Sequence, residues 1–211
     1  PTVLVFEEGY HGGVLSFAHG IGPLNVPHDF LIVPYNDVPA VEAAFAARGA
    51  SIACVVVEPV QGSGGCIPAE PGFLAALRRL CTEHGSVLIF DEVMTSRLHP
   101  GGAQALFGVL PDMTTLGKYL AGGMTFGAFG GRRSIMAAFD PAQGGALSQA
   151  GTFNNNVVSM AAGVAALRDV LTPQALIALN DRGDELRDRL NVTFAGAGLP
   201  MTVMGVGSMM N

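Results

Sequence analysis

The residue in this sequence best suited to covalent chemistry is Lys118, the only lysine among eleven basic residues. A lysine amine can lose its proton and condense with a carbonyl group, whereas an arginine guanidinium stays protonated. A GC-rich genome can replace lysine by arginine without any functional cause. From composition alone, a reactive amine at Lys118 and a lysine that was retained by chance are therefore equally good interpretations.

The position of Lys118 favours the functional interpretation. It follows a predicted strand and precedes a glycine-rich turn, and an earlier strand, Val87–Phe90, runs directly into Asp91. Ligands of open α/β sheets bind at the carboxyl ends of the strands, so we expect Asp91 and Lys118 to share one crevice. The alternative for Asp91 is a solvated acid or a helix N-cap. An amine and an anion in one crevice suit pyridoxal phosphate, whose aldehyde needs the amine and whose pyridine nitrogen needs the anion.

Strands that position these residues are indicated by short apolar runs that alternate with helical patterns. This alternation predicts an α/β fold with a largely parallel sheet. The run Ala53–Val57 is apolar without alternation, as is typical of a strand covered on both faces. The predicted strands are Val3–Phe6, Phe30–Val33, Ile52–Val57, Val87–Phe90, the region around Met113–Leu116, and Gly127–Gly130.

Helices are predicted between these strands. One should begin after Asp37, and another should open at Pro71 and end at Gly85. Two more are expected over Asn155–Leu171 and Pro173–Phe194. The last is long and charged on its outer side, so we expect residues 1–172 to form part of a large cofactor-binding domain, and residues 173–211 to form a long helix and the start of a C-terminal small domain.

Composition and charge exclude several classes of function. A net charge of −6 provides no basic face for nucleic acid. No apolar stretch approaches the ~20 residues that span a bilayer, and the histidines and cysteines lack metal-ligand spacing, so neither a membrane protein nor a metal site is expected. The three cysteines are widely spaced and read as reduced thiols of a cytoplasmic protein.

Five motifs follow one another along the chain, and together they carry a family resemblance. They are Tyr10-His11-Gly12, Val57-Glu58-Pro59-Val60-Gln61-Gly62, Asp91-Glu92-Val93-Met94-Thr95, Gly117-Lys118, and Gly151-Thr152-Phe153-Asn154-Asn155-Asn156. By these motifs nearly the whole chain resembles the class III (subgroup II) pyridoxal-phosphate aminotransferases, in the glutamate-1-semialdehyde aminomutase-like branch. The resemblance implies fold type I of these enzymes, a mostly parallel sheet with helices on both faces.

The resemblance also implies a role for each matching residue around the cofactor ring. Lys118 would form a Schiff base with pyridoxal phosphate and, once released, move protons between substrate and cofactor. Asp91 would pair with the pyridine nitrogen. Tyr10 would stack on one face of the ring, and Val93 would pack on the other.

The remaining residues of the motifs are assigned by the same resemblance. His11 and Gly12 would bind the cofactor together with Tyr10. Glu58 would lie near the substrate and the cofactor edge, with an ion pair to an arginine as the alternative. Thr152 would donate a hydrogen bond to the phosphate of the cofactor in a neighbouring subunit, because this family forms homodimers with shared active sites.

Both ends of the sequence read as cut, so we expect a fragment of the large domain. Relatives carry a Ser/Gly-Thr phosphate-binding loop upstream of the Tyr-His-Gly motif, and nothing in this sequence corresponds to it. The run Gly62–Gly65 does not replace that loop, because it lacks the strand-to-helix position that a phosphate cradle needs. Met94 stands where many relatives have glutamine, a difference that the aminomutase branch shares.

The expected function is that of a pyridoxal-phosphate-dependent aminotransferase. It would move an amino group from a small-molecule donor, β-amino acids included, to an oxo-acid acceptor. The segment Asp91–Gln104 favours this over the alternative of glutamate-1-semialdehyde 2,1-aminomutase, which transfers the group within one molecule. A truncated fragment without catalysis is a further alternative. A nicotinamide-dependent dehydrogenase is disfavoured, because no G-x-G-x-x-G leads from a strand into a helix.

Overall fold

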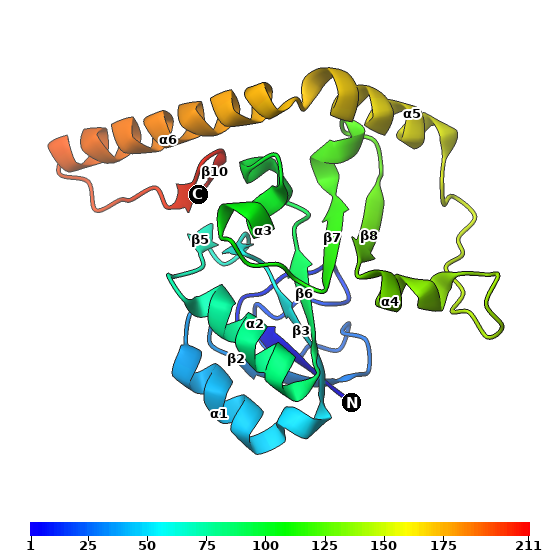
Figure 1. The fold of residues 1–211 in the computed structure, drawn as a ribbon. Coiled ribbons are helices and arrows are strands. Elements are labelled where there is room, and N and C mark those ends of the chain that lie inside the picture. The colour runs from blue at the N-terminus through cyan, green and yellow to red at the C-terminus, as the bar shows by residue number, and fades with distance from the viewer.

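The fold is built on a six-stranded sheet, which a computed structural model of residues 1–211 places at the centre of the chain (Figure 1). All neighbours pair in parallel except β8, which runs antiparallel to β7. The mostly parallel sheet expected from the sequence is therefore confirmed. The strands, in spatial order, are β2 (Asp29–Val33), β1 (Thr2–Phe6), β3 (Ile52–Val57), β6 (Val87–Asp91), β7 (Met113–Gly117) and β8 (Gly127–Gly131).

Helices α1 (Val38–Arg48) and α2 (Phe73–His84) pack side by side on one face of the sheet (Figure 1). Helix α1 begins after Asp37 and α2 ends at Gly85, as predicted, but α2 begins at Phe73 rather than at Pro71, with Gly72 as its N-cap. The Asp37 carboxylate accepts the Ala40 N–H at 2.8 Å, and Gly85 ends α2 in the left-handed conformation that glycine adopts without strain. The apolar stripe of α2 is buried against the sheet and forms most of the main core with Leu4, Phe6, Val55, Val57, Leu88 and Phe90.

The opposite face is covered in a different way. Phe17 packs there on Val5 and Phe30, within the loop that joins β1 to β2. The Phe17 and Phe30 rings meet edge to face at 5.0 Å between centroids. Of the helices expected on both faces, α1 and α2 supply one face, whereas this loop covers the other beside β1 and β2.

Short helices follow the carboxyl ends of β6 and β7. These are η2 (Thr95–Leu98), α3 (Gly102–Leu106) and η3 (Lys118–Ala121), and α5 (Val157–Ala165) packs against η3. The helix predicted over Asn155–Leu171 begins at Val157, because the Asn156 side chain caps it, and its last turn is the π-helix η5 (Ala166–Val170). The remaining elements are β4 (Val60–Gln61), β5 (Ile67–Pro68), η1 (Gly49–Ser51), α4 (Arg133–Met136) and η4 (Ala137–Phe139).

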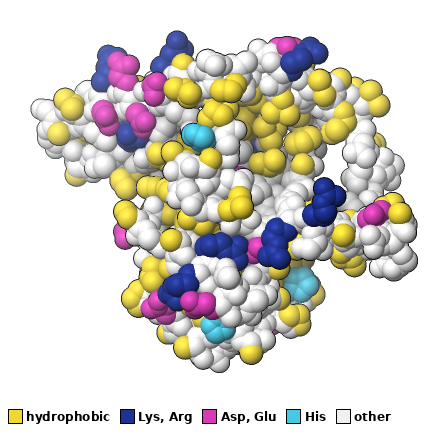
Figure 2. Space-filling model, in the orientation of Figure 1, with side chains coloured by type: hydrophobic (Ala, Val, Ile, Leu, Met, Phe, Trp, Pro, Cys, Tyr) yellow, Lys and Arg dark blue, Asp and Glu magenta, His cyan; other side chains and the backbone are white.

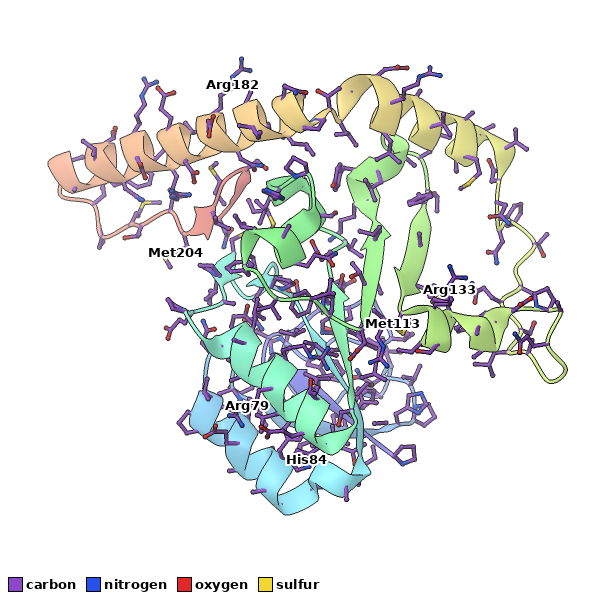
Figure 3. The ribbon with its side chains drawn as sticks, viewed as in Figure 1. Arg79, His84, Met113, Arg133, Arg182 and Met204 are labelled. Atoms are coloured by element: carbon purple, nitrogen blue, oxygen red, sulfur yellow. The ribbon has the colours of Figure 1, made fainter.

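The long helix α6 (Pro173–Gly196) runs along the edge of the molecule, and the chain then turns back beneath it as β9 (Gly205–Val206) and β10 (Met209–Met210) (Figure 1). Figure 3 shows Arg182 pointing away from the body on the outer side of α6, as expected for its charged face. No single helix is long and apolar enough to cross a membrane. The pair Val157–Val170 and Pro173–Gly196 meets that criterion only when taken together, with a bend of 78°. The assignment of residues 173–211 to a second domain stays a prediction.

Replacement by alanine should affect stability differently at two glycines of α6, Gly183 and Gly196. A Cβ at Gly183 would collide with the backbone of Gly207 and Ser208, whereas a Cβ at Gly196 would meet nothing within 4 Å. We expect Gly183→Ala to lower the stability by about 1–3 kcal/mol, because the β9–β10 hairpin must move. The matched control Gly196→Ala should be neutral or raise it by up to about 1 kcal/mol. Thermal unfolding of the full-length variants measures both, and equal melting temperatures would contradict this packing.

Candidate active site

A cavity of about 150 Å³ opens at the carboxyl ends of β3, β6 and β7. It brings together every residue predicted for the site except Thr152. Because these residues come from four separate stretches of the chain, the cavity depends on the sheet to assemble it. Its lining consists of Tyr10, His11, Gly12, Glu58, Asp91, Val93, Met94, Thr95 and Lys118.

The Asp91 carboxylate lies at the end of β6 and is held by three hydrogen bonds. Oδ1 accepts the Val93 N–H and the Thr115 hydroxyl, both at 3.1 Å, and Oδ2 lies 2.8 Å from Nδ1 of His11. A carboxylate has about four lone-pair positions. Three are therefore filled by the protein, and one position, on Oδ2, is free to accept a further hydrogen bond. Asp91 is neither a freely solvated acid nor a helix cap.

His11 keeps Asp91 in its charged form. The two side chains are only 5% and 11% exposed, so solvent barely screens their contact. Burial alone would raise the pKa of Asp91. The hydrogen bond and charge of His11, with the Val93 and Thr115 donors, outweigh burial and hold that pKa below its ordinary value of 3.8. An ionised Asp91 only accepts hydrogen bonds, so Nδ1 of His11 carries the proton between them.

Lys118 begins the turn that follows β7, and its backbone is in the left-handed region at a φ of 48°. This conformation is costly for a residue with a Cβ, and non-glycine residues that adopt it cluster at functional sites. The preceding Gly117 lets β7 pass close to its neighbours, since a Cβ there would lie 3.2 Å from the Phe126 carbonyl oxygen and 3.5 Å from Val93. The Lys118 side chain has no ion-pair partner and lines the cavity.

Glu58 connects the end of β3 to two turns that frame the cavity. Its Oε1 accepts the Tyr10 N–H at 3.0 Å and its Oε2 accepts the Gly62 N–H at 2.9 Å. No arginine pairs with it, so the alternative of an ion pair with arginine is wrong, and backbone amides stabilise the carboxylate instead. Burial raises the pKa of Glu58 above its usual range. Tyr10 itself is 46% exposed at the rim, and its stacking role stays a prediction.

Thr152 lies apart from this cavity, in an exposed segment between η4 and α5. Its neighbours Gly151 and Phe153 line a second, larger cavity beside β8, of about 730 Å³. The structure therefore does not bring Thr152 to Lys118 of the same chain. A contact with the cofactor of a neighbouring subunit stays a prediction.

Two residues near the site were not anticipated. Thr115 lies opposite Asp91 in the β6–β7 register, and the shared face of paired strands could have revealed it. Glu92 points away from the cavity, is fully buried, and accepts the N–H groups of Ala103 and Gln104, which fixes the start of α3. No local sequence pattern predicts this role of Glu92, because its partners lie eleven and twelve positions away in the chain.

This chain resembles known proteins in both sequence and structure. The family model for class-III aminotransferases matches residues 1–211. A β-phenylalanine transaminase of Variovorax paradoxus is 54% identical over 209 residues, which cover 99% of this chain and 48% of the relative. The crystal structure of the β-phenylalanine aminotransferase from that organism superposes with a TM-score of 0.96 at 53% identity, over 100% of this chain and 49% of the other.

More distant relatives include one enzyme with a different activity and one transaminase with a bound ligand. A glutamate-1-semialdehyde 2,1-aminomutase of Sorangium cellulosum is 45% identical over 224 residues, 99% of this chain and 50% of the relative. A transaminase solved with pyridoxal phosphate bound has a TM-score of 0.89 at 34% identity, over 98% of this chain and 52% of that structure. The chain thus spans about half the length of the relatives that it matches.

Proposed function

The chain belongs to the class-III aminotransferase family, and on that premise we propose that the protein containing it is a pyridoxal-phosphate-dependent aminotransferase. One observation carries the proposal. The amine of Lys118 and the open acceptor position of Asp91 line the same cavity, on the ends of neighbouring strands. These are the two groups that pyridoxal phosphate requires of a protein: an amine for its aldehyde and an anion for its ring nitrogen.

The residues present fit this cofactor. An ionised carboxylate with one unfilled lone pair can accept a hydrogen bond from a protonated ring nitrogen. An unprotonated ring nitrogen would instead direct its own lone pair at the carboxylate and be repelled. Val93 and Tyr10 offer an apolar and an aromatic surface on the lining of the same cavity. We propose that His11 contributes through Asp91, and that Gly12 and Glu58 shape the Tyr10 side of the site.

The chain's own residues would share the work as follows. Pyridoxal phosphate, when bound, supplies an aldehyde that reacts with primary amines and a ring that withdraws electrons from the substrate carbon. Lys118 would hold the cofactor covalently. Once released as a free amine, it would take a proton from the substrate carbon and deliver it to the cofactor. Asp91 would keep the ring nitrogen protonated, and His11 would keep Asp91 ionised.

We propose intermolecular transfer, with a β-amino acid as the donor and an oxo acid as the acceptor. The β-phenylalanine transaminase is 54% identical to this chain, against 45% for the aminomutase, which supports this choice. The aminomutase reaction is the second candidate, because two glutamate-1-semialdehyde aminomutases also match almost the whole chain.

An assay of the full-length protein separates the two reactions. With β-phenylalanine, 2-oxoglutarate and pyridoxal phosphate present, we expect 2-oxoglutarate to be converted to glutamate. The Lys118→Arg variant keeps the positive charge but cannot condense with the aldehyde, so its rate should fall by at least about a thousandfold, since it loses the covalent and proton-transfer roles together. Its circular dichroism should match that of the unchanged protein.

Two results would contradict this assignment. Substantial transamination by the Lys118→Arg variant would remove the lysine from the chemistry. Formation of 5-aminolevulinate from glutamate-1-semialdehyde without any added amino donor would favour the aminomutase instead.

We further propose that the enzyme is a homodimer joined through α5 and η5. Figure 2 shows hydrophobic side chains gathered on and beneath this helical segment, and a contiguous exposed apolar surface is typical of an interaction site. Its most exposed apolar residues are Phe153, Val157, Val158, Val164, Leu167 and Val170, of which Phe153 and Val157 are about four-fifths exposed. This surface adjoins Thr152, so pairing would bring Thr152 to a neighbouring subunit.

A charged residue in this surface tests the dimer. Val157→Asp should yield a monomer by light scattering and reduce transamination, because a buried unpaired carboxylate would oppose association. The exposed Val192 on α6 supplies a matched control, and Val192→Asp should remain dimeric. A monomeric unchanged protein, or a dimeric Val157→Asp variant, would contradict this interface.

We propose a cytoplasmic location on the basis of the thiols. Cys54, Cys66 and Cys81 are all free, and burial raises the pKa of each, which makes them unreactive. Reduced structural thiols are typical of a reducing compartment. Recovery of the full-length protein in a membrane or secreted fraction would oppose this location.

A further inference from the structure

Thr115 is a neighbour of Asp91 that none of the family motifs includes. The parallel register of β6 and β7 sets the two residues opposite each other, so both side chains leave the same face of the sheet. The Thr115 hydroxyl donates to Oδ1 of Asp91 at 3.1 Å. The preceding Thr114 leaves the other face and lines a separate cavity beneath η5 and α6.

The contact with Thr115 decides which lone pair of Asp91 remains open. Oδ1 is filled by Thr115 and by the Val93 N–H, whereas Oδ2 has His11 alone. Without the Thr115 hydroxyl, each oxygen would have one protein donor and one open position. The carboxylate could then rotate and present either oxygen to the cavity, and Oδ1 would lose a partner at a site that is only 11% exposed.

We propose that Thr115 is a positioning residue, whose hydroxyl orients the Asp91 carboxylate so that the single open acceptor on Oδ2 faces the cofactor ring nitrogen. The proposal rests on the proposed function, since it concerns how the same site holds pyridoxal phosphate. Thr115 itself does not line the cavity, so it acts through Asp91 rather than on the cofactor or the substrate.

The charges that face Asp91 set the direction of the expected pH effect. They are His11 from the Tyr10–Gly12 turn, Glu58 from the end of β3, and Lys118 from the turn after β7. His11 and the Thr115 hydroxyl both lower the pKa of Asp91. Removal of the hydroxyl therefore raises that pKa, so the carboxylate becomes protonated, and its hold on the ring nitrogen is lost, at a higher pH than in the unchanged protein.

Three substitutions in the full-length protein isolate the hydroxyl. Thr115→Val removes it at nearly constant volume, Thr115→Ser keeps it, and Thr114→Val makes the same chemical change on the opposite face. The dissociation constant for pyridoxal phosphate, followed by its absorbance from pH 8 down through the ordinary carboxylate pKa of 3.8, is the first readout. We expect about tenfold weaker binding by Thr115→Val, the scale of one lost hydrogen bond to a charged group, and an acid limb displaced to higher pH.

The controls make the outcome decisive. Thr115→Ser should restore both the affinity and the pH profile, and Thr114→Val should leave both unchanged. If Thr115→Val matches Thr114→Val, or if Thr115→Ser behaves like Thr115→Val, the positioning role is wrong. Borohydride fixation of the cofactor to Lys118 in the unchanged protein tests the proposed function separately, so failure of fixation there would overturn that function rather than the role of Thr115.

Discussion

The structure of the candidate site depends on keeping one buried carboxylate charged. A buried ionised group is costly unless donors surround it, and Asp91 receives its donors from three separate segments. Val93 lies two residues away, Thr115 lies on the neighbouring strand, and His11 lies 80 positions earlier in the chain. The β6–β7 register and the turn after β1 must therefore both be correct before Asp91 can serve as an anion.

The carboxylates in and around the site differ in pKa because their surroundings differ. Asp91 has a lowered pKa because His11 adds a charge and a hydrogen bond, whereas Glu58 and Glu92 have raised pKa values because burial outweighs their backbone donors. Glu58, after β3, fixes a turn at the rim of the cavity, and Glu92, after β6, fixes the start of α3. Lys118 lies beside them in a left-handed turn, at a φ of 48°.

Much of this arrangement could be predicted from the sequence because it is encoded locally. Apolar runs located the strands, Asp37 and Gly85 marked helix ends, and the residues after two strands indicated the site. The antiparallel direction of β8, the His11–Asp91 contact and the backbone partners of Glu58 could not be predicted, because they depend on register and on loop closure over tens of residues. Periodicity reports which face of a strand is buried, and it does not report which distant donor will meet it.

The central claim is that Asp91 offers one open acceptor to a protonated ring nitrogen. The most direct measurement is the ¹⁵N NMR shift of pyridoxal phosphate, labelled at that nitrogen and bound to the full-length protein. We expect the shift of a protonated, hydrogen-bonded nitrogen at neutral and mildly alkaline pH, and its loss in Asp91→Asn. An unprotonated nitrogen in the unchanged protein, or a protonated one that persists in Asp91→Asn, would contradict the claim.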